Sequence, residues 1–374
     1  MTGRADDRRV ALVTAATDAG GAERVIELLA ARLGRHGMTP VLSAPEDGGL
    51  LSRWQAAGFE TCALPAFGRL RRVDLGARIV AEITRRLRSA RIGIIHAHGV
   101  AAHIHAGLAA RRLSRPAIYH VHDLFENTWS ADGALQRFAL RVPAARVIAI
   151  SATVAASLER RVAPAKLRTV LNGVDAAIVE PAARAAGPLV VWCGRLQHWK
   201  GPHHFIAAAA LVRASRPDAR FAIVGGTLFG LEPDYRDLIE QQVAAAGLAG
   251  VLEFVGHVDD ARPWLRAADV VVHCADHPEP FGLVMAEAMM QERPVAAFRQ
   301  GGAAEIVVDG ETGRLVAALD VPALASAVLD LVADPSRARA MGAAGRQRAE
   351  QVFNADGMTA AMSAVYDAVS SAHE

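Results

Sequence analysis

Short apolar runs alternate with longer amphipathic stretches along nearly the whole chain of 374 residues. Runs such as 9–14, 92–96 and 189–193 have the length of buried strands, and the stretches between them have helical length and spacing. This alternation is typical of parallel sheets that are covered by helices on both faces. The sequence therefore predicts an α/β fold of the doubly wound type.

The alternation occurs in two series, which are separated by an Ala- and Pro-rich stretch at 174–189. Because single cores rarely grow beyond about 250–300 residues, we expect two domains, over 1–180 and 188–353. The expected strands are 9–14, 40–43, 60–64, 92–96, 117–120, 146–150 and 166–170, then 189–193, 219–224, 251–255, 270–274, 295–298 and 313–316. The tail from 321 is predicted to be helical, with breaks near Asp334 and Asn354. Ligands of such sheets collect at the carboxyl ends of the strands, so we expect the domains to face a central cleft.

Composition narrows the class of protein. The 41 basic and 39 acidic side chains give a net charge of +2, which offers no support for nucleic-acid binding. The cysteines (Cys62, Cys193, Cys274) have no Cys-x-x-Cys spacing and read as reduced thiols, so a cytoplasmic protein is expected. We find no secretory leader pattern and no apolar window of 18 residues. An Arg-rich helix at 78–91 leaves weak peripheral membrane contact open.

Two carboxylates, Glu279 and Glu287, bracket the segment Pro-Phe-Gly-Leu-Val-Met-Ala. Glu279 lies between two prolines and is therefore expected on a loop that enters a helix, with Glu287 inside that helix. The backbone amides between them are free to bind an anion. Such a helix mouth suits an anionic ligand that also carries hydroxyl groups, which means a phosphorylated sugar or a nucleotide.

The first strand of the second domain is followed by Gly194, Arg195 and Lys200. A guanidinium and an ammonium at one strand end can neutralise a diphosphate. The segment is not a Walker A loop, because Lys200 is followed by Gly and no Gly directly precedes it.

Gly20 and Gly21 follow the first strand of the first domain and open a helix, where the backbone can approach a ligand closely. A plain tight turn explains them as well. The turn Gly301-Gly302 is equally open to a structural or a ligand role, and the Asn172-Gly173 turn is read as structural.

Histidines are clustered in the first domain as the pairs His96/His98, His103/His105 and His120/His122. Zinc ligation is disfavoured, because no carboxylate or cysteine completes a ligand set with the expected spacing. His122, which precedes Asp123 just past a strand, is the candidate for contacting substrate hydroxyl groups. No serine, cysteine or lysine nucleophile has a recognisable context, so a covalent hydrolase is unsupported.

Together these segments resemble glycosyltransferase family 4, the group of retaining, nucleotide-sugar-dependent transferases. The resemblance runs from about Val10 to Arg346, and its specific parts are the Glu279–Glu287 and Arg195–Lys200 segments. It departs before Glu279, where many members carry a serine-containing loop and this chain has Cys274-Ala-Asp-His-Pro.

The resemblance implies the GT-B architecture of two Rossmann-like domains, with the last helix, 354–374, packing back onto the first domain. It implies that Arg195 and Lys200 hold the donor diphosphate, Glu287 the ribose and Glu279 the transferred sugar. It also implies donor contacts from residues at three loops (Gly20, Gly21, Gly194, Phe281, Gly282, Leu283) and a sugar contact from His122. On the acceptor side we expect His98, Asp123 and Trp129. No metal or other cofactor is expected beside the nucleoside diphosphate sugar, since no Asp-x-Asp loop is present.

The predicted function is retaining transfer of a hexose-type sugar to a hydroxyl-bearing acceptor, with a UDP-sugar slightly favoured over a GDP-sugar. A sugar-nucleotide epimerase or hydrolase on the same scaffold is an alternative, and so is a non-catalytic sugar-nucleotide-binding subunit. The acceptor, which could be a small molecule, a glycolipid or a glycan, and the oligomeric state stay open.

Overall fold

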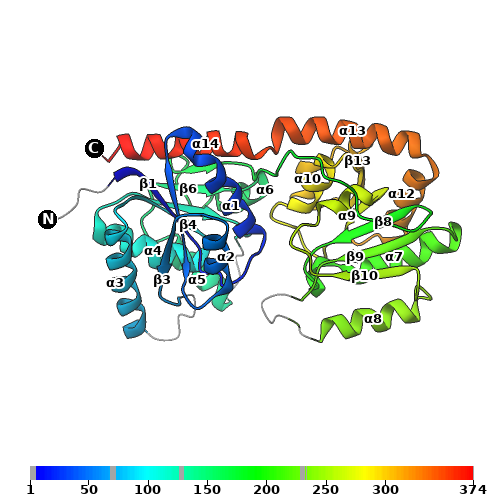
Figure 1. The fold of residues 1–374 in the computed structure, drawn as a ribbon, viewed down its shortest axis with the longest axis horizontal. Helices are drawn as coiled ribbons and strands as arrows, with labels where there is room; N and C mark the ends of the chain where they lie inside the picture. The colour runs from blue at the N-terminus through cyan, green and yellow to red at the C-terminus, as the bar shows by residue number, and fades with distance from the viewer. Residues whose placement is uncertain (1–5, 68–72, 126–129, 228–231, 233, 374) are drawn as a thin grey trace. The chain divides into compact units, whose positions relative to one another are not determined.

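The computed structural model describes residues 6–67, 73–125, 130–227, 232 and 234–373, and these form two compact units (Figure 1). Unit 1 consists of Met1–Gly173 together with Ala355–Glu374, and unit 2 consists of Val174–Asn354.

Unit 1 is built on a parallel sheet in the order β3-β2-β1-β4-β5-β6-β7. Its central strand β4 is buried along its whole length, as expected where helices cover both faces of a sheet. The strands are β1 (Asp6–Val13), β2 (Thr39–Pro45), β3 (Thr61–Leu64), β4 (Ile92–His98), β5 (Ala117–Val121), β6 (Arg146–Ala149) and β7 (Leu167–Thr169). The helices are α1 (Gly21–Leu33), η1 (Gly34–His36), α2 (Gly49–Ala56), α3 (Val73–Ser89), α4 (Val100–Leu113), α5 (Ala131–Ala139), α6 (Ala152–Leu158) and α14 (Ala355–Ser371).

Unit 2 repeats the plan with a parallel sheet in the order β10-β9-β8-β11-β12-β13. The strands are β8 (Leu189–Cys193), β9 (Arg220–Val224), β10 (Leu252–Gly256), β11 (Val270–His273), β12 (Val295–Phe298) and β13 (Gly313–Val316). The helices are η2 (His198–Lys200), α7 (Pro202–Ser215), α8 (Tyr235–Ala245), α9 (Arg262–Ala267), α10 (Leu283–Met290), α11 (Ala303–Ile306), α12 (Val321–Ala333) and α13 (Pro335–Val352). The prediction of two doubly wound parallel sheets is therefore confirmed.

Each sheet changes direction of winding at one place. In unit 1 this switch lies between β1 and β4, and in unit 2 it lies between β8 and β11. The loops after such neighbouring strands diverge to opposite faces of the sheet and leave room for a ligand between them. The segments beginning at Gly194 and at Cys274 follow β8 and β11, so both donor-side motifs lie at the switch of unit 2.

The boundary between helices α12 and α13 is set by Asp334 and Pro335. The Asp334 side chain accepts hydrogen bonds from the amides of Ser336 and Arg337, and Pro335 is the first residue of α13. This combination of an N-cap and a proline at the first position ends α12 and starts the next helix.

Helix α14 packs against α1 within unit 1, and its Tyr366 is completely buried. The Tyr366 hydroxyl lies 2.7 Å from Nδ1 of His96 on β4, so the last helix is hydrogen-bonded to the central sheet. Arg32 of α1 also forms an ion pair with Asp356 at 3.1 Å on the surface.

On α3, the Arg-rich helix, Arg85 and Arg86 form ion pairs with Glu82 at 2.6 and 2.7 Å. Arg86 also pairs with Glu46 at 2.7 Å, so part of the basic face is neutralised within the protein. Among the described helices, none is both long and apolar enough to cross a lipid bilayer.

Replacing Tyr366 by Phe is expected to lower the free energy of unfolding by about 1–3 kcal/mol, because it leaves a buried nitrogen of His96 without its partner. Chemical denaturation measures this loss. The exposed Ser371 of the same helix is the control, and Ser371→Ala should change stability by less than about 0.5 kcal/mol. Equal, small effects of both substitutions would contradict the proposed importance of the hydrogen bond.

Candidate functional site

Lys200 and Glu279 form a buried ion pair at the switch of unit 2. The Lys200 ammonium donates to both Glu279 carboxylate oxygens, at 2.6 and 2.7 Å. The two side chains are only 17% and 11% exposed. Lys200 is one of two lysines in the chain, the other being the exposed Lys166. The ammonium has three protons, so one of them is left for a ligand.

Neighbouring side chains hold this pair in place. The Lys200 ammonium lies 4.0 Å from the centre of the Trp199 ring, a favourable cation–π contact. His273 at the end of β11 approaches Glu279, with its Nε2 3.3 Å from the Glu279 Oε2. Burial opposes ionisation, but the charge of Lys200 and the hydrogen bond from His273 outweigh it and lower the pKa of Glu279. Glu279 is therefore an ionised acceptor at neutral pH.

The loops after β8, β11 and β12 are in direct backbone contact. Gly201 has φ +72°, and a Cβ there would lie 1.8 Å from the Cys274 carbonyl oxygen, so only glycine fits. The Asp276 amide donates to the Trp199 carbonyl at 2.8 Å. The Gly302 amide donates to the Glu279 carbonyl at 2.7 Å, and a Cβ on Gly302 would lie 2.0 Å from the Phe281 carbonyl oxygen. The Gly301-Gly302 turn thus supports the Glu279 loop, which is its structural role.

Arg195 and Glu287 complete the charged residues predicted at this site. Arg195 lies half-buried two residues after β8, and Glu287 lies half-buried within α10. The charges of Glu287 and Lys200 both influence the pKa of Cys193, which lies at the end of β8. Burial and the charge of Glu287 raise the pKa of its thiol to about 12, while the charge of Lys200 acts in the opposite direction. Cys193 is thus within electrostatic range of both Glu287 and Lys200.

Helix α10 begins directly after the Glu279 loop. Gly282 is its N-cap and Leu283 its first residue, while Phe281 is buried. The first amides of a helix have no partner inside it, and they carry a partial positive charge. The segment Phe281–Leu283 therefore offers donors to an anion beside the Lys200–Glu279 pair.

In unit 1, Gly20 is the N-cap of α1 and Gly21 is its first residue. The buried Glu23 holds this turn: it accepts a hydrogen bond from the Gly20 amide at 3.1 Å and one from the Thr14 hydroxyl at 2.9 Å. The turn following β1 is thus fixed in position, and Glu23 is a supporting residue that the sequence argument did not single out.

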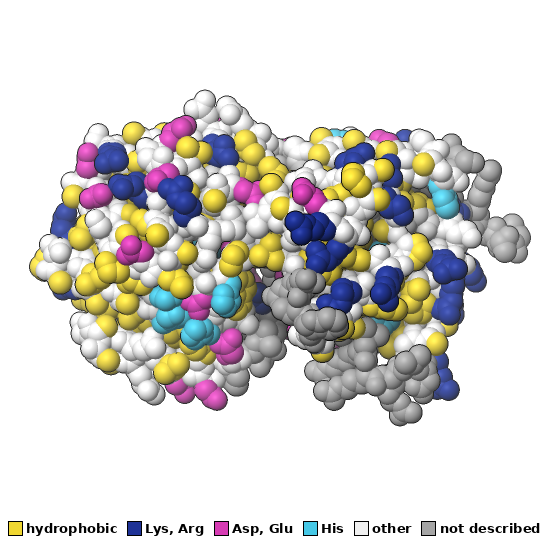
Figure 2. Space-filling view, turned by 180° about the vertical axis from the view of Figure 1, so that it is seen from behind, with side chains coloured by type: hydrophobic (Ala, Val, Ile, Leu, Met, Phe, Trp, Pro, Cys, Tyr) yellow, Lys and Arg dark blue, Asp and Glu magenta, His cyan; other side chains and the backbone are white. Residues whose placement is uncertain are grey.

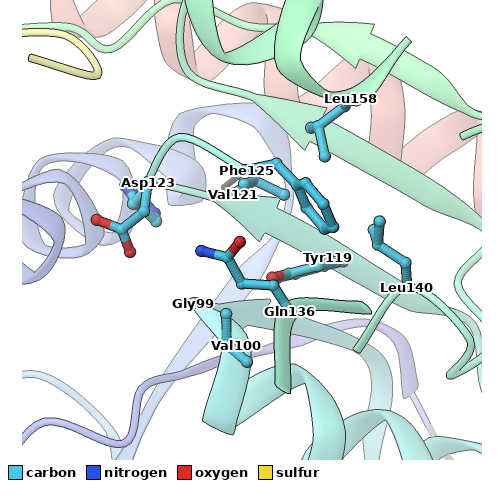
Figure 3. A pocket seen from close by; sticks show the side chains of 10 residues that line it. Gly99, Val100, Tyr119, Val121, Asp123, Phe125, Gln136, Leu140 and Leu158 are labelled. Atoms are coloured by element: carbon cyan, nitrogen blue, oxygen red, sulfur yellow. The ribbon is translucent and has the colours of Figure 1, made fainter. Parts of the chain in front are cut away.

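His98 and His122 meet at the carboxyl ends of β4 and β5, where Nδ1 of His98 lies 3.0 Å from Nε2 of His122. Burial lowers the pKa of His122 to about 4, so its imidazole is neutral at pH 7. Beside it is a recess of about 10 Å³, room for about one water molecule. The recess is lined by Gly99, Val100, Tyr119, Val121, His122, Asp123, Phe125, Gln136, Leu140 and Leu158. In Figure 3 the Asp123 carboxylate points away from the rings of Tyr119 and Phe125. Trp129 lies outside the described residues.

The other histidines of the pairs are buried as well. His96 lies with Nε2 3.2 Å from Nδ1 of His120, and potential metal-binding atoms of His96, His98 and His120 lie within 4.8 Å of one another. Nε2 of His98 and Nε2 of His120 are buried without a hydrogen-bond partner among the described residues. Burial lowers the pKa of His96 to about 3, and it also lowers those of His98 and His120.

The structure thus brings Lys200 and Glu279 into contact, and it places Arg195, Glu287 and the start of α10 on the segments around them. In unit 1 it brings His98 and His122 together at the strand ends next to the switch. Sequence reasoning missed His273 and Trp199, which touch the ion pair directly. Their only sequence signal was position, since each lies within six residues of a predicted charged residue.

Two family models match adjoining parts of the chain. Residues 176–348 match Glycosyl transferases group 1, and residues 19–178 match Glycosyltransferase Family 4. The D-inositol 3-phosphate glycosyltransferase of Thermobispora bispora is 30% identical over 307 residues, which cover 73% of this chain and 72% of that relative. The chain therefore belongs to glycosyltransferase family 4.

Other relatives match over shorter parts. Glycogen synthase of Mycobacterium tuberculosis strain H37Rv is 34% identical over 207 residues, 54% of this chain and 48% of that protein. The lipopolysaccharide core biosynthesis mannosyltransferase LpcC of Rhizobium leguminosarum is 32% identical over 208 residues, 53% of this chain and 58% of that protein. The match thus spans about half the length of each of these relatives.

Solved structures share the fold. HepE of Anabaena, in complex with UDP and glucose, has a TM-score of 0.84 and 24% identity, over 96% of this chain and 99% of HepE. Sucrose-phosphate synthase of Thermosynechococcus elongatus has a TM-score of 0.78 and 24% identity, over 97% and 99% of the two chains. The predicted GT-B architecture is confirmed.

Replacing Lys200 by Met is expected to lower the free energy of unfolding of unit 2 by about 3–5 kcal/mol, because it leaves a buried carboxylate unpaired. The double variant Lys200→Met, Glu279→Gln should recover much of this loss, since no uncompensated charge remains. Urea unfolding of the wild type, both single variants and the double variant measures the coupling. Strictly additive losses would contradict the pairing.

Lowering the pH from 7 to 5 is expected to destabilise unit 1. Unfolded histidines take up protons near pH 6.5, whereas folded His122 and His96 resist protonation until about pH 4 and about pH 3. Stability is therefore lost as pH falls below about 6.5. His122→Gln should reduce the slope by up to about 1.4 kcal/mol per pH unit. Thermal unfolding across this range measures it, with the exposed His257→Asn as control; an unchanged slope in His122→Gln would refute the assignment.

Proposed function

We propose that the protein is a retaining glycosyltransferase that moves a hexose-type sugar from a nucleoside diphosphate sugar to a hydroxyl-bearing acceptor. The observation that carries this proposal is the buried Lys200–Glu279 pair at the switch between β8 and β11. A cation and an acceptor-only carboxylate, side by side beneath a helix N-terminus, match a ligand in which a diphosphate adjoins a ring of hydroxyl groups.

The diphosphate is the leaving group, so negative charge grows on it as the anomeric C–O bond breaks. In the proposed complex the free proton of Lys200, the guanidinium of Arg195 and the first amides of α10 point at this charge. Such preorganised donors stabilise the transition state more than the ground state. Gly194 leaves the diphosphate close access to the backbone, and no divalent ion takes part in the transfer step.

The carboxylates position the rest of the donor. Glu279 has about four lone-pair directions, of which Lys200 and His273 use part, so sugar hydroxyls can donate to the remainder. Glu287 would accept from the hydroxyls of the ribose. Retention follows when the acceptor hydroxyl attacks the face that the diphosphate leaves and the departing phosphate takes its proton.

We further propose that unit 2 binds the donor and unit 1 the acceptor. In unit 1, the neutral His122 can donate to or accept from a sugar hydroxyl, and the Gly20-Gly21 turn lets the backbone approach the phosphate. His98, Asp123 and Trp129 would lie on the acceptor side.

Relatives support the substrate classes. HepE was solved with UDP and with UDP-glucose, which favours a uridine donor. Similar proteins are named as D-inositol 3-phosphate glycosyltransferases and as a lipopolysaccharide core biosynthesis mannosyltransferase, and these transferase names favour transfer over hydrolysis.

A footprint of the two lysines tests the donor site without altering the protein. UDP-glucose or UDP should protect Lys200 from an amine-reactive reagent, whereas the exposed Lys166 should react at the same rate with and without nucleotide. Mass spectrometry of the digested chain measures both rates. If Lys200 is labelled at the same rate with and without UDP, GDP and their sugars, the nucleotide does not bind at this site.

Activity is tested with Glu279→Gln and Lys200→Met against Lys166→Met. Loss of one charged contact to the leaving group or sugar is expected to lower kcat about 100- to 1,000-fold, and Lys166→Met should leave it unchanged. Transfer is measured as acceptor-dependent release of the nucleoside diphosphate. If the nucleoside diphosphate is released at the same rate with and without a hydroxyl-bearing acceptor, the protein is a hydrolase. If the sugar is altered while it stays attached to the nucleotide, the protein is an epimerase.

A further inference from the structure

Three histidines and one aspartate converge beside the Lys200 turn in unit 2. This histidine–aspartate cluster consists of His198 in η2, His203 and His204 in the first turn of α7, and Asp276 after β11. Nδ1 of His198 lies 2.9 Å from Oδ2 of Asp276, and Nε2 of His203 and Nε2 of His204 lie 3.3 and 2.6 Å from Oδ1. Figure 2 shows histidine side chains gathered at the surface beside acidic ones.

The protein backbone holds these side chains together. Gly201, between the histidines, presses against the Cys274 carbonyl, and the Asp276 amide donates to the Trp199 carbonyl. The metal-binding atoms of His198, His203 and Asp276 all lie within 4.8 Å of one another. The cluster is therefore fixed by the same loop contacts that position Lys200 and Glu279.

Tyr235 of α8 orients the His203 ring, because its hydroxyl lies 3.1 Å from Nδ1, the ring nitrogen that does not face Asp276. A proton on Nδ1 that is donated to the tyrosine oxygen leaves the Nε2 lone pair directed at the cluster. This arrangement, in which the second ring nitrogen is hydrogen-bonded to an outer residue, is the usual support of a metal-binding histidine.

One contact in the cluster is unsatisfied. Nε2 of His204 and Oδ1 of Asp276 are buried and 2.6 Å apart, yet neither makes a hydrogen bond of acceptable geometry with any described residue. A cation bound by Asp276 would give its buried Oδ1 a partner. The His198 side chain is 64% exposed, so an ion can enter from solvent.

We propose that the histidine–aspartate cluster binds a divalent transition-metal cation, with His198, His203 and Asp276 as its protein ligands. Imidazole nitrogens with one carboxylate oxygen suit Zn²⁺ and its neighbours Co²⁺ and Ni²⁺, and disfavour Mg²⁺ and Ca²⁺. The ion would tie the loop after β8 to the loop after β11 and would take no part in bond breaking. The proposal stands independently of the proposed function.

The buried histidines of unit 1 are the competing location. There, both ring nitrogens of His96 already have partners, in Tyr366 and His120, and no carboxylate is among the grouped ligands. The histidine–aspartate cluster in unit 2 includes the carboxylate of Asp276, the hydrogen bond between Tyr235 and His203, and the solvent-exposed His198. The structure therefore favours this cluster as the metal site.

The test uses the untagged full-length chain, because a histidine tag binds the same ions. Zn²⁺ binding is measured by competition with a chromophoric chelator, and Co²⁺ absorption reports the ligand geometry. We expect one Zn²⁺ per chain and a rise in the thermal midpoint. His198→Asn and Asp276→Asn should each weaken binding at least about 10-fold, and Tyr235→Phe should weaken it about 10- to 100-fold by freeing His203.

His257→Asn, an exposed histidine of the same unit outside the cluster, is the matched control and should bind as the wild type does. Because His198 lies at the surface, its variant keeps the test valid if Asp276→Asn fails to fold. The absence of saturable Zn²⁺ binding would overturn the proposal. Unchanged Zn²⁺ affinity in His198→Asn and Tyr235→Phe would also overturn it, because the bound ion would then lie elsewhere. Equal weakening in His257→Asn would overturn it as well.

Discussion

The buried pair of Lys200 and Glu279 is the interaction on which the geometry of unit 2 depends. Two charges are removed from water there, and such burial is tolerated only when the partners meet in good geometry with further hydrogen bonds. Trp199, His273 and the backbone of the Gly301-Gly302 turn supply that support. The pair joins the loop after β8 to the loop after β11, and the backbone contacts between these loops hold both residues in place.

The two units share a plan but differ in the charge of their strand-end residues. At the switch of unit 2 the groups are ionised, and a buried carboxylate with a lowered pKa faces an ammonium. At the ends of β4 and β5 in unit 1, His98 and His122 are neutral because burial lowers their pKa values. Fixed charges suit a charged diphosphate, and neutral imidazoles suit hydroxyl groups. The same topology thus offers two chemically different surfaces.

Local signals in the sequence predicted the elements well. The bounds of β8, β12 and β13 match, and the breaks at Asp334 and Asn354 fall where predicted, because prolines, caps and apolar periodicity act over a few residues. What the sequence could not reveal are partners distant along the chain. Lys200 and Glu279 are 79 positions apart and His96 and Tyr366 are 270 apart, so only the fold pairs them. His198 and Asp276 are also far apart along the chain, so their sequence positions do not form a recognisable metal-ligand motif.

Unit 1 is assembled from both ends of the chain, and this has a consequence for its biosynthesis. The ribosome completes Met1–Gly173 first and then makes all of unit 2 before it reaches Ala355. At typical elongation speeds of about 5–20 residues per second, the sheet of unit 1 waits roughly 10–40 s for Tyr366. During that interval the His96 face of the nascent sheet lacks its final cover, which gives chaperones a window in which to shield it.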